Sequence, residues 1–156
     1  MKIIKLKRNK DSRGYLAETY NKKFIGGKEL VFDYKVISKK NIFRGFHFQY
    51  KFQQVKLISV LKGKILDCVI DLRKNSKTFG KIYKTILSEK NRRSIFIPEG
   101  FAHGYLSLDK INLVYFKNSN YRHKNHEKGI LWDDEDINLK LPIKKPLISK
   151  KDKLNI

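Results

Sequence analysis

Two histidines and a lysine stand in short apolar segments that could bring them to one cavity. His47 lies in the segment RGFHFQ, and His103 follows the Pro98–Gly100 turn in IPEGFAHGY. Lys56 opens the intervening segment KLISVLKG. An imidazole exchanges protons near neutral pH, and an ammonium group can hold a negatively charged oxygen. The pattern therefore predicts a small barrel with polar groups pointing into its mouth.

The segments around these residues have the pattern of short β-strands. In residues 43–49, alternation places His47 and Gln49 on one face and Phe46 and Phe48 on the other. Further strands are predicted at residues 2–6, 14–20, 30–37, 55–61, 65–72, 81–87, 94–97, 102–108 and 112–117. Roughly ten short strands separated by turns are typical of an all-β sandwich or barrel. A short polar helix or turn is expected after Tyr121.

Length and composition indicate a single domain over residues 1–156. The chain is 40% hydrophobic and 12% aromatic, which is typical of a globular protein. Residues 118–156 are more charged and weakly periodic, and we expect this segment to pack over the barrel mouth. No apolar stretch has the length of a secretory or membrane segment, so a soluble cytoplasmic protein is expected. The single cysteine, Cys68, suits a reducing compartment and a buried strand position.

The formal net charge of +21 raises the question of nucleic-acid binding. Of the 36 basic residues, 29 are lysines spread along the whole chain and only seven are arginines. Specific base recognition depends strongly on arginine, so nucleic acid is not expected as the main partner. A phosphorylated small molecule fits the same charge.

A motif of metal-binding cupin barrels is present in part. Residues 98–103 match its Pro-x-Gly-x-x-His element fully. The earlier element is degenerate, because Gln49 stands where a second histidine would follow His47, and no glutamate precedes Gly63. Two imidazoles without a carboxylate make an incomplete set of ligands, so the sequence predicts no resident metal.

A wider set of motifs covers nearly the whole chain. In order, they are Arg13-Gly14 with Glu18, RGFHFQ, VKLISVLKGKILDCVIDLR, SKTFG, IPEGFAHGY, Tyr115, Asn120-Tyr121, GILWDD and LISKKD. Together they resemble the dTDP-4-dehydrorhamnose 3,5-epimerase family. The resemblance implies a cupin-type antiparallel β-barrel (a jelly roll) and an isomerase that needs neither cofactor nor metal. The implied substrate is a nucleotide-diphosphate-linked 4-keto-6-deoxy sugar of rhamnose-type deoxysugar biosynthesis, with inversion at C3, C5 or both.

The resemblance also implies catalytic roles for four residues. His47 would be the base that removes a proton beside the ketone, and Asp152 would orient and polarise it. Lys56 would lie by the C4 oxygen, where it stabilises the enolate. Tyr115 would return a proton from the far side of the sugar ring.

A second set is implied to bind the substrate. Arg44 and Gln49 would contact the diphosphate, and Tyr121 would stack on the nucleobase. The remaining members of the set are Glu18, His103 and Lys151. The chain departs from the family at Leu16, where an aromatic residue is usual, at Asp33-Tyr34-Lys35 in place of Gln-x-Asn, and at Lys151 in place of arginine.

The sequence is also compatible with two other functions. A related cupin, the sugar 3,4-ketoisomerase, usually carries a second histidine where this chain has Gln49. A non-catalytic barrel that binds nucleotide sugars or RNA is a further alternative. The resemblance also implies a homodimer, in which the strand Gly14–Tyr20 pairs with or lies against the partner.

Overall fold

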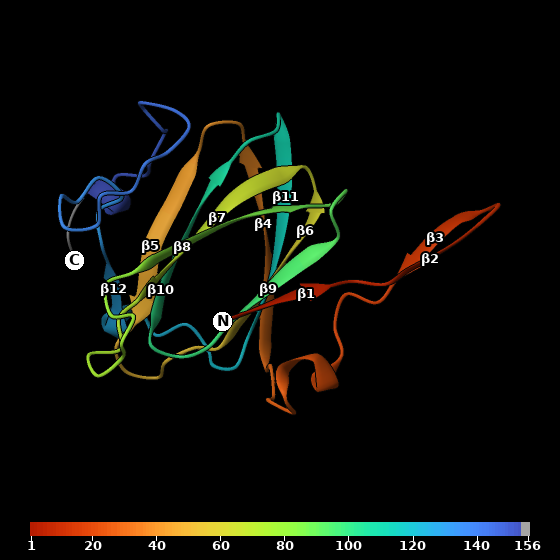
Figure 1. The fold of residues 1–156 in the computed structure, drawn as a ribbon, viewed down its shortest axis with the longest axis horizontal. Helices are drawn as coiled ribbons and strands as arrows, with labels where there is room; N and C mark the ends of the chain where they lie inside the picture. Colours follow the sequence, from red (N-terminus) through yellow and green to blue (C-terminus); the bar gives the residue numbers. More distant parts are fainter. Residues whose placement is uncertain (154–156) are drawn as a thin grey trace.

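The computed structural model describes residues 1–153, and two five-stranded antiparallel sheets dominate it (Figure 1). The first sheet has the order β1 (Lys2–Lys5), β9 (Arg93–Ile97), β6 (Lys56–Lys62), β11 (Ile111–Asn118) and β4 (Phe32–Lys39). The second has the order β12 (Glu127–Gly129), β5 (Phe43–Gln49), β10 (Phe101–Ser107), β7 (Lys64–Asp71) and β8 (Ile82–Ser88). The expected all-β cupin-type barrel is confirmed.

The remaining elements are short. A separate hairpin is formed by β2 (Arg8–Asp11) and β3 (Gly14–Ala17). Three 3₁₀ turns lie at η1 (Lys22–Ile25), η2 (Lys124–His126) and η3 (Lys151–Lys153), so the turn expected after Tyr121 is present. No helix within residues 1–153 is long and apolar enough to span a membrane.

Most strands lie where the alternation of apolar residues predicts them. The exceptions are strands that form only because they pair with a neighbouring strand. The strand expected at 30–37 runs from Phe32 to Lys39, and the one expected at 14–20 ends at Ala17. The strands β2 and β12 were not predicted, because RNKD and EKG have no alternation of apolar residues. Each exists through its ladder to a neighbour, β3 in one case and β5 in the other.

The main core fills the space between the two sheets. Its buried side chains come from β6, β9 and β11 on one side and from β7, β8 and β10 on the other. On β11 the alternation is strict: Val114 and Phe116 point inward, whereas Tyr115 and Lys117 lie on the outer face. This alternation decides which β11 side chains can reach a site between the sheets.

A second core covers the outer face of the second sheet. Phe43, Phe46 and the buried Cys68 belong to one apolar cluster, against which Trp132 and Leu139 of the C-terminal segment pack. The segment thus forms a third layer beside β5 (Figure 1). After this layer the chain reaches η3, which contacts β5.

The β2–β3 hairpin projects away from the barrel (Figure 1). Its apolar residues Tyr15 and Leu16 are exposed. The hairpin has few contacts with the rest of the described chain. It follows β1 and precedes η1 in the sequence.

Candidate active site

A pocket of about 410 Å³ opens between the two sheets. The first sheet contributes Phe32, Tyr34, Val36, Lys56 and Phe116, and the second contributes Arg44, His47, Phe48, Gln49, His103, Tyr105 and Glu127. Ser149, Lys151 and Asp152 come from the C-terminal segment, and Gln54 and Arg122 complete the lining. The pocket therefore joins side chains from both walls of the barrel with the far end of the chain.

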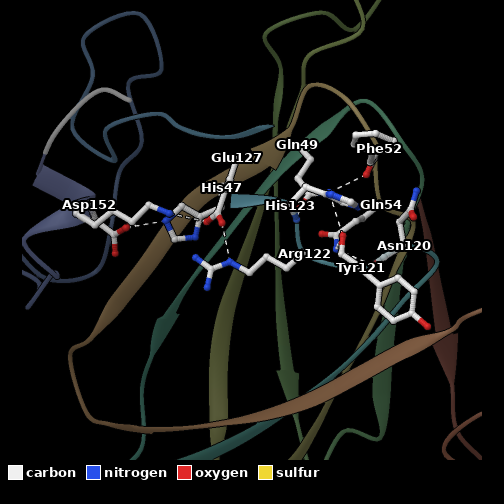
Figure 2. Close-up of polar contacts among 11 residues, drawn as sticks. His47, Gln49, Phe52, Gln54, Asn120, Tyr121, Arg122, His123, Glu127 and Asp152 are labelled. Carbon is white, nitrogen blue, oxygen red and sulfur yellow. Dashed lines mark hydrogen bonds and ion pairs between the residues drawn. The ribbon is translucent and has the colours of Figure 1, made fainter. Parts of the chain in front are cut away.

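His47 and Asp152 form a hydrogen-bonded pair at this pocket (Figure 2). His47 Nε2 lies 2.6 Å from Asp152 Oδ1, and the carboxyl side chain is only 5% exposed, against 32% for the imidazole. Burial disfavours the charged carboxylate, but the hydrogen bonds with His47 and Ser149 outweigh it and hold the pKa of Asp152 below its usual range. With Nε2 engaged, Nδ1 is the nitrogen that can exchange a proton with a bound molecule.

Lys56 lies on β6, the central strand of the first sheet, while His47 lies on the second sheet. Burial lowers the pKa of Lys56 to about 8, and the nearby Glu127 and Asp67 carboxylates only partly offset this shift. The ammonium group is therefore held in a poorly solvated position, where its charge acts strongly on a neighbouring oxygen. Such a group is suited to stabilise an enolate.

His103 forms a second histidine–carboxylate pair deeper in the wall. It is the register partner of His47 on the adjacent strand, and its Nε2 lies 2.7 Å from Asp67 Oδ2. His103 is 5% exposed and Asp67 is fully buried. Each of the two imidazoles thus has one nitrogen tied to a carboxylate, and no group of three metal-ligating side chains occurs in residues 1–153.

A cluster of charges surrounds the pocket mouth. Glu127 accepts hydrogen bonds of 2.7 Å from both Arg122 Nε and Lys151 Nζ. Burial opposes ionisation of Glu127, but these two cations outweigh it and lower its pKa to about 2. Arg44 also lines the pocket, with Nε donating to Ser38 Oγ at 3.0 Å. Cations outnumber carboxylates here, which suits a diphosphate group.

Comparison with known proteins supplies a family for this arrangement. The family model described as dTDP-4-dehydrorhamnose 3,5-epimerase matches residues 1–156. A protein of that name from Methanothermobacter thermautotrophicus is 42% identical over 150 residues, covering 92% of this chain and 81% of the relative. The chain belongs to the dTDP-4-dehydrorhamnose 3,5-epimerase family.

Solved structures of epimerases have the same fold as this chain. The Bacillus anthracis dTDP-4-dehydrorhamnose 3,5-epimerase, with TDP and PPi bound, superimposes with a TM-score of 0.95 at 35% identity, covering 99% of this chain and 91% of that one. A 3,5-epimerase from Legionella pneumophila in complex with dTDP-4-keto-L-rhamnose gives a TM-score of 0.92 at 34% identity, covering 97% and 84%. Family membership thus rests on both sequence and fold.

Gln49, which the family resemblance implies, lines the pocket and shares a hydrogen-bond network with the backbone of Tyr121, whose ring does not line the pocket (Figure 2). The Gln49 side chain donates to the carbonyl oxygens of Phe52 at 2.7 Å and Tyr121 at 3.3 Å, and it accepts from the His123 N–H at 2.7 Å. Gln49 therefore positions the loop that carries Tyr121. The Tyr121 ring is exposed and 6.0 Å from the ring of Phe32, so stacking on a nucleobase stays a prediction.

Tyr115 and Glu18 are not brought to this pocket. The Tyr115 hydroxyl donates to Asp33 at 2.6 Å on the outer face of the first sheet, so Tyr115 is not placed to protonate a sugar between the sheets. Strand alternation is the cause, since Phe116 takes the inward position. Glu18 accepts a hydrogen bond from Asn21 in the N-terminal segment and does not line the pocket of its own chain.

Several lining residues were not predicted from the sequence, and three of them matter most for the chemistry of the pocket. Arg122 had a usable signal, because it is one of only seven arginines and follows the implied nucleobase contact directly. Glu127 had none, since its role depends on the unpredicted strand β12. Tyr34 was noted only as part of a departure from the family pattern, although alternation along β4 puts it on the same face as Phe32 and Val36.

Proposed function

We propose that this chain is a cofactor-independent epimerase that inverts C3, C5 or both in a dTDP-linked 4-keto-6-deoxy sugar. The observation that carries the proposal is the His47–Asp152 pair on one wall of the pocket and the half-buried Lys56 on the other. Family membership supports the reaction class, and the thymidine nucleotides named for the solved relatives support the choice of nucleotide.

The reaction begins with proton removal beside the ketone. His47 takes the proton through its free nitrogen, and the Asp152 carboxylate stabilises the imidazolium that forms. The electron pair left on carbon moves to the C4 oxygen, and the Lys56 ammonium stabilises the resulting enolate. A positioned base contributes ~10²–10⁴-fold, and one oxyanion donor contributes about 3–4 kcal/mol. Return of a proton to the opposite face inverts the carbon.

The cations at the pocket mouth would hold the diphosphate. Arg44 and Arg122 present guanidinium groups, which match phosphate oxygens in pairs, and Lys151 adds a third charge. Two of these cations already neutralise Glu127, so a diphosphate would extend an existing ion-pair network.

Incubation with dTDP-4-keto-6-deoxyglucose in D₂O tests the proposal. We expect deuterium at C3, C5 or both and an inverted sugar in the NMR spectrum, because enolisation exposes those hydrogens to solvent. A 3-keto product would instead indicate the ketoisomerase. Binding without any exchange would indicate a non-catalytic barrel, and steeply salt-dependent RNA binding would point to nucleic acid.

We further propose a homodimer formed through the segment from Gly14 to Tyr20, with the reaction taking place in the cytoplasm. The projecting β2–β3 hairpin exposes Leu16 at 68%, and a second copy would cover it. Sedimentation at micromolar concentration is expected to give a dimer, and Leu16→Asp should shift it toward monomer. Phe79→Asp, at a similarly exposed apolar residue away from the hairpin, should leave the dimer unchanged. A wild-type monomer would contradict the proposal.

A further inference from the structure

Inversion needs an acid on the wall that faces His47, and Tyr115 does not supply it. The pocket lies between the sheets, with His47 on the second sheet. A group that protonates the other face of the sugar must therefore come from the first sheet. Two tyrosines line the pocket, Tyr34 and Tyr105.

Tyr105 is unsuited to this task by position and by contacts. It lies on β10, which is in the same sheet as His47 and next to its strand. The side chain is only 2% exposed. Its hydroxyl contacts Ser38 Oγ at 3.3 Å, and that oxygen also accepts a hydrogen bond from Arg44. Tyr105 thus supports the wall on the side of the base.

Tyr34 has the opposite properties. It lies on β4 in the first sheet, on the strand face that carries Phe32 and Val36 into the pocket. The side chain is 38% exposed, in contrast to Tyr105. The pKa of its hydroxyl is set by burial and by nearby charges. Within residues 1–153 the hydroxyl makes no hydrogen bond. A phenol is thus available on the wall that faces the base.

Local contacts fix the Tyr34 ring in this orientation. Tyr34 is the register partner of Phe116 on β11, and the two rings stack with centroids 4.9 Å apart and planes 10° apart. Burial raises the pKa of Tyr34 to about 12, although the Arg122 guanidinium acts in the other direction. The phenol therefore keeps its proton at neutral pH, as a donor must.

We propose that Tyr34 is the catalytic acid that protonates the sugar on the face opposite His47. The inference rests on the proposed epimerase function. His47 takes one proton from carbon, the enolate collapses to the ketone, and the Tyr34 O–H bond breaks to form the new C–H bond. The phenolate, near Arg122, regains a proton from solvent while the His47 imidazolium loses one, so the isomerisation is balanced.

The test is Tyr34→Phe, which keeps the stacked ring and removes only the hydroxyl. With dTDP-4-keto-6-deoxyglucose in D₂O, deuterium exchange with retention should persist near the wild-type rate. Inverted product should fall by ~10²-fold or more, the loss expected for a missing positioned acid. Tyr115→Phe is the matched control and should leave both rates unchanged.

A relocation experiment separates catalysis from structure. The double variant Tyr34→Phe with Phe116→Tyr moves the hydroxyl to the register partner on β11, so it should restore inversion in part. Inversion at the wild-type rate in Tyr34→Phe, or its loss in Tyr115→Phe, would overturn the inference while leaving the epimerase function intact. A wild-type protein that exchanges no deuterium would overturn both.

Discussion

Replacement of His47 by asparagine is expected to abolish deuterium exchange at every carbon that the wild-type protein labels. Asparagine can still accept or donate a hydrogen bond near Asp152, but its amide cannot take a proton from carbon. The imidazole lines the pocket and is held by the buried Asp152 carboxylate through a 2.6 Å contact on Nε2. Loss of a positioned base should reduce the rate by ~10²–10⁴-fold, to the limit of detection by NMR.

Binding separates this outcome from a folding defect. The affinity for dTDP, measured by calorimetry, should remain close to wild type, because the variant leaves intact Arg44, Arg122 and Lys151, the cations proposed to hold the phosphates. His126→Asn is a suitable control, since His126 contacts Tyr50 outside the pocket. If His47→Asn still exchanges deuterium at the wild-type rate, the base has been assigned wrongly.

Lys56→Met should slow exchange at all labelled carbons together, because the lost ammonium raises the energy of the shared enolate. One oxyanion donor is worth about 10²–10³-fold in rate. The pH profile gives a second readout. The pKa of Lys56 is about 8, so the ammonium is present below that pH and is lost as the pH rises through it. Exchange in the wild type should therefore fall above about pH 8.

The same strand offers a matched control for Lys56. Lys62 is an exposed lysine at the far end of β6, and Lys62→Met should change neither the exchange rate nor its pH profile. In Lys56→Met the residual exchange should no longer fall on the alkaline side of pH 8. Persistence of that fall in the variant would show that another group titrates there.

Several residues of the site could be predicted because they lie within short sequence motifs. His47 lies on a strand whose apolar alternation is clear in the sequence, Lys56 opens a nearly continuous apolar strand, and His103 follows a Pro-x-Gly turn. Asp152 was reached only through the family resemblance. No local pattern in a lysine-rich segment could indicate that a carboxylate lies 2.6 Å from a strand 105 residues earlier.

The placement of Tyr115 shows where motif matching failed. A strand has a period of two, so a shift of one residue moves a side chain to the other face. The alternation along β11 is unbroken from Ile111 to Asn118, although its ladder to β6 shifts register between Leu113 and Val114. Val114 and Phe116 face inward. The sequence of this strand does not show which face is inward, because residues 111, 113 and 115 are apolar as well as residues 114 and 116.

The third layer of the fold has a consequence for the order in which the protein becomes active. The segment after Asn118 packs against the second sheet through side chains such as Trp132 and Leu139, and only then delivers Asp152 to His47. On the ribosome, every strand of the two sheets, β12 included, is synthesised before that carboxylate. A nascent chain interrupted before Ser149 carries His47 and Lys56, the proposed base and enolate-stabilising group, without the Asp152 carboxylate that bonds to His47. The proposed His47–Asp152 pair can therefore form only after both sheets have been synthesised.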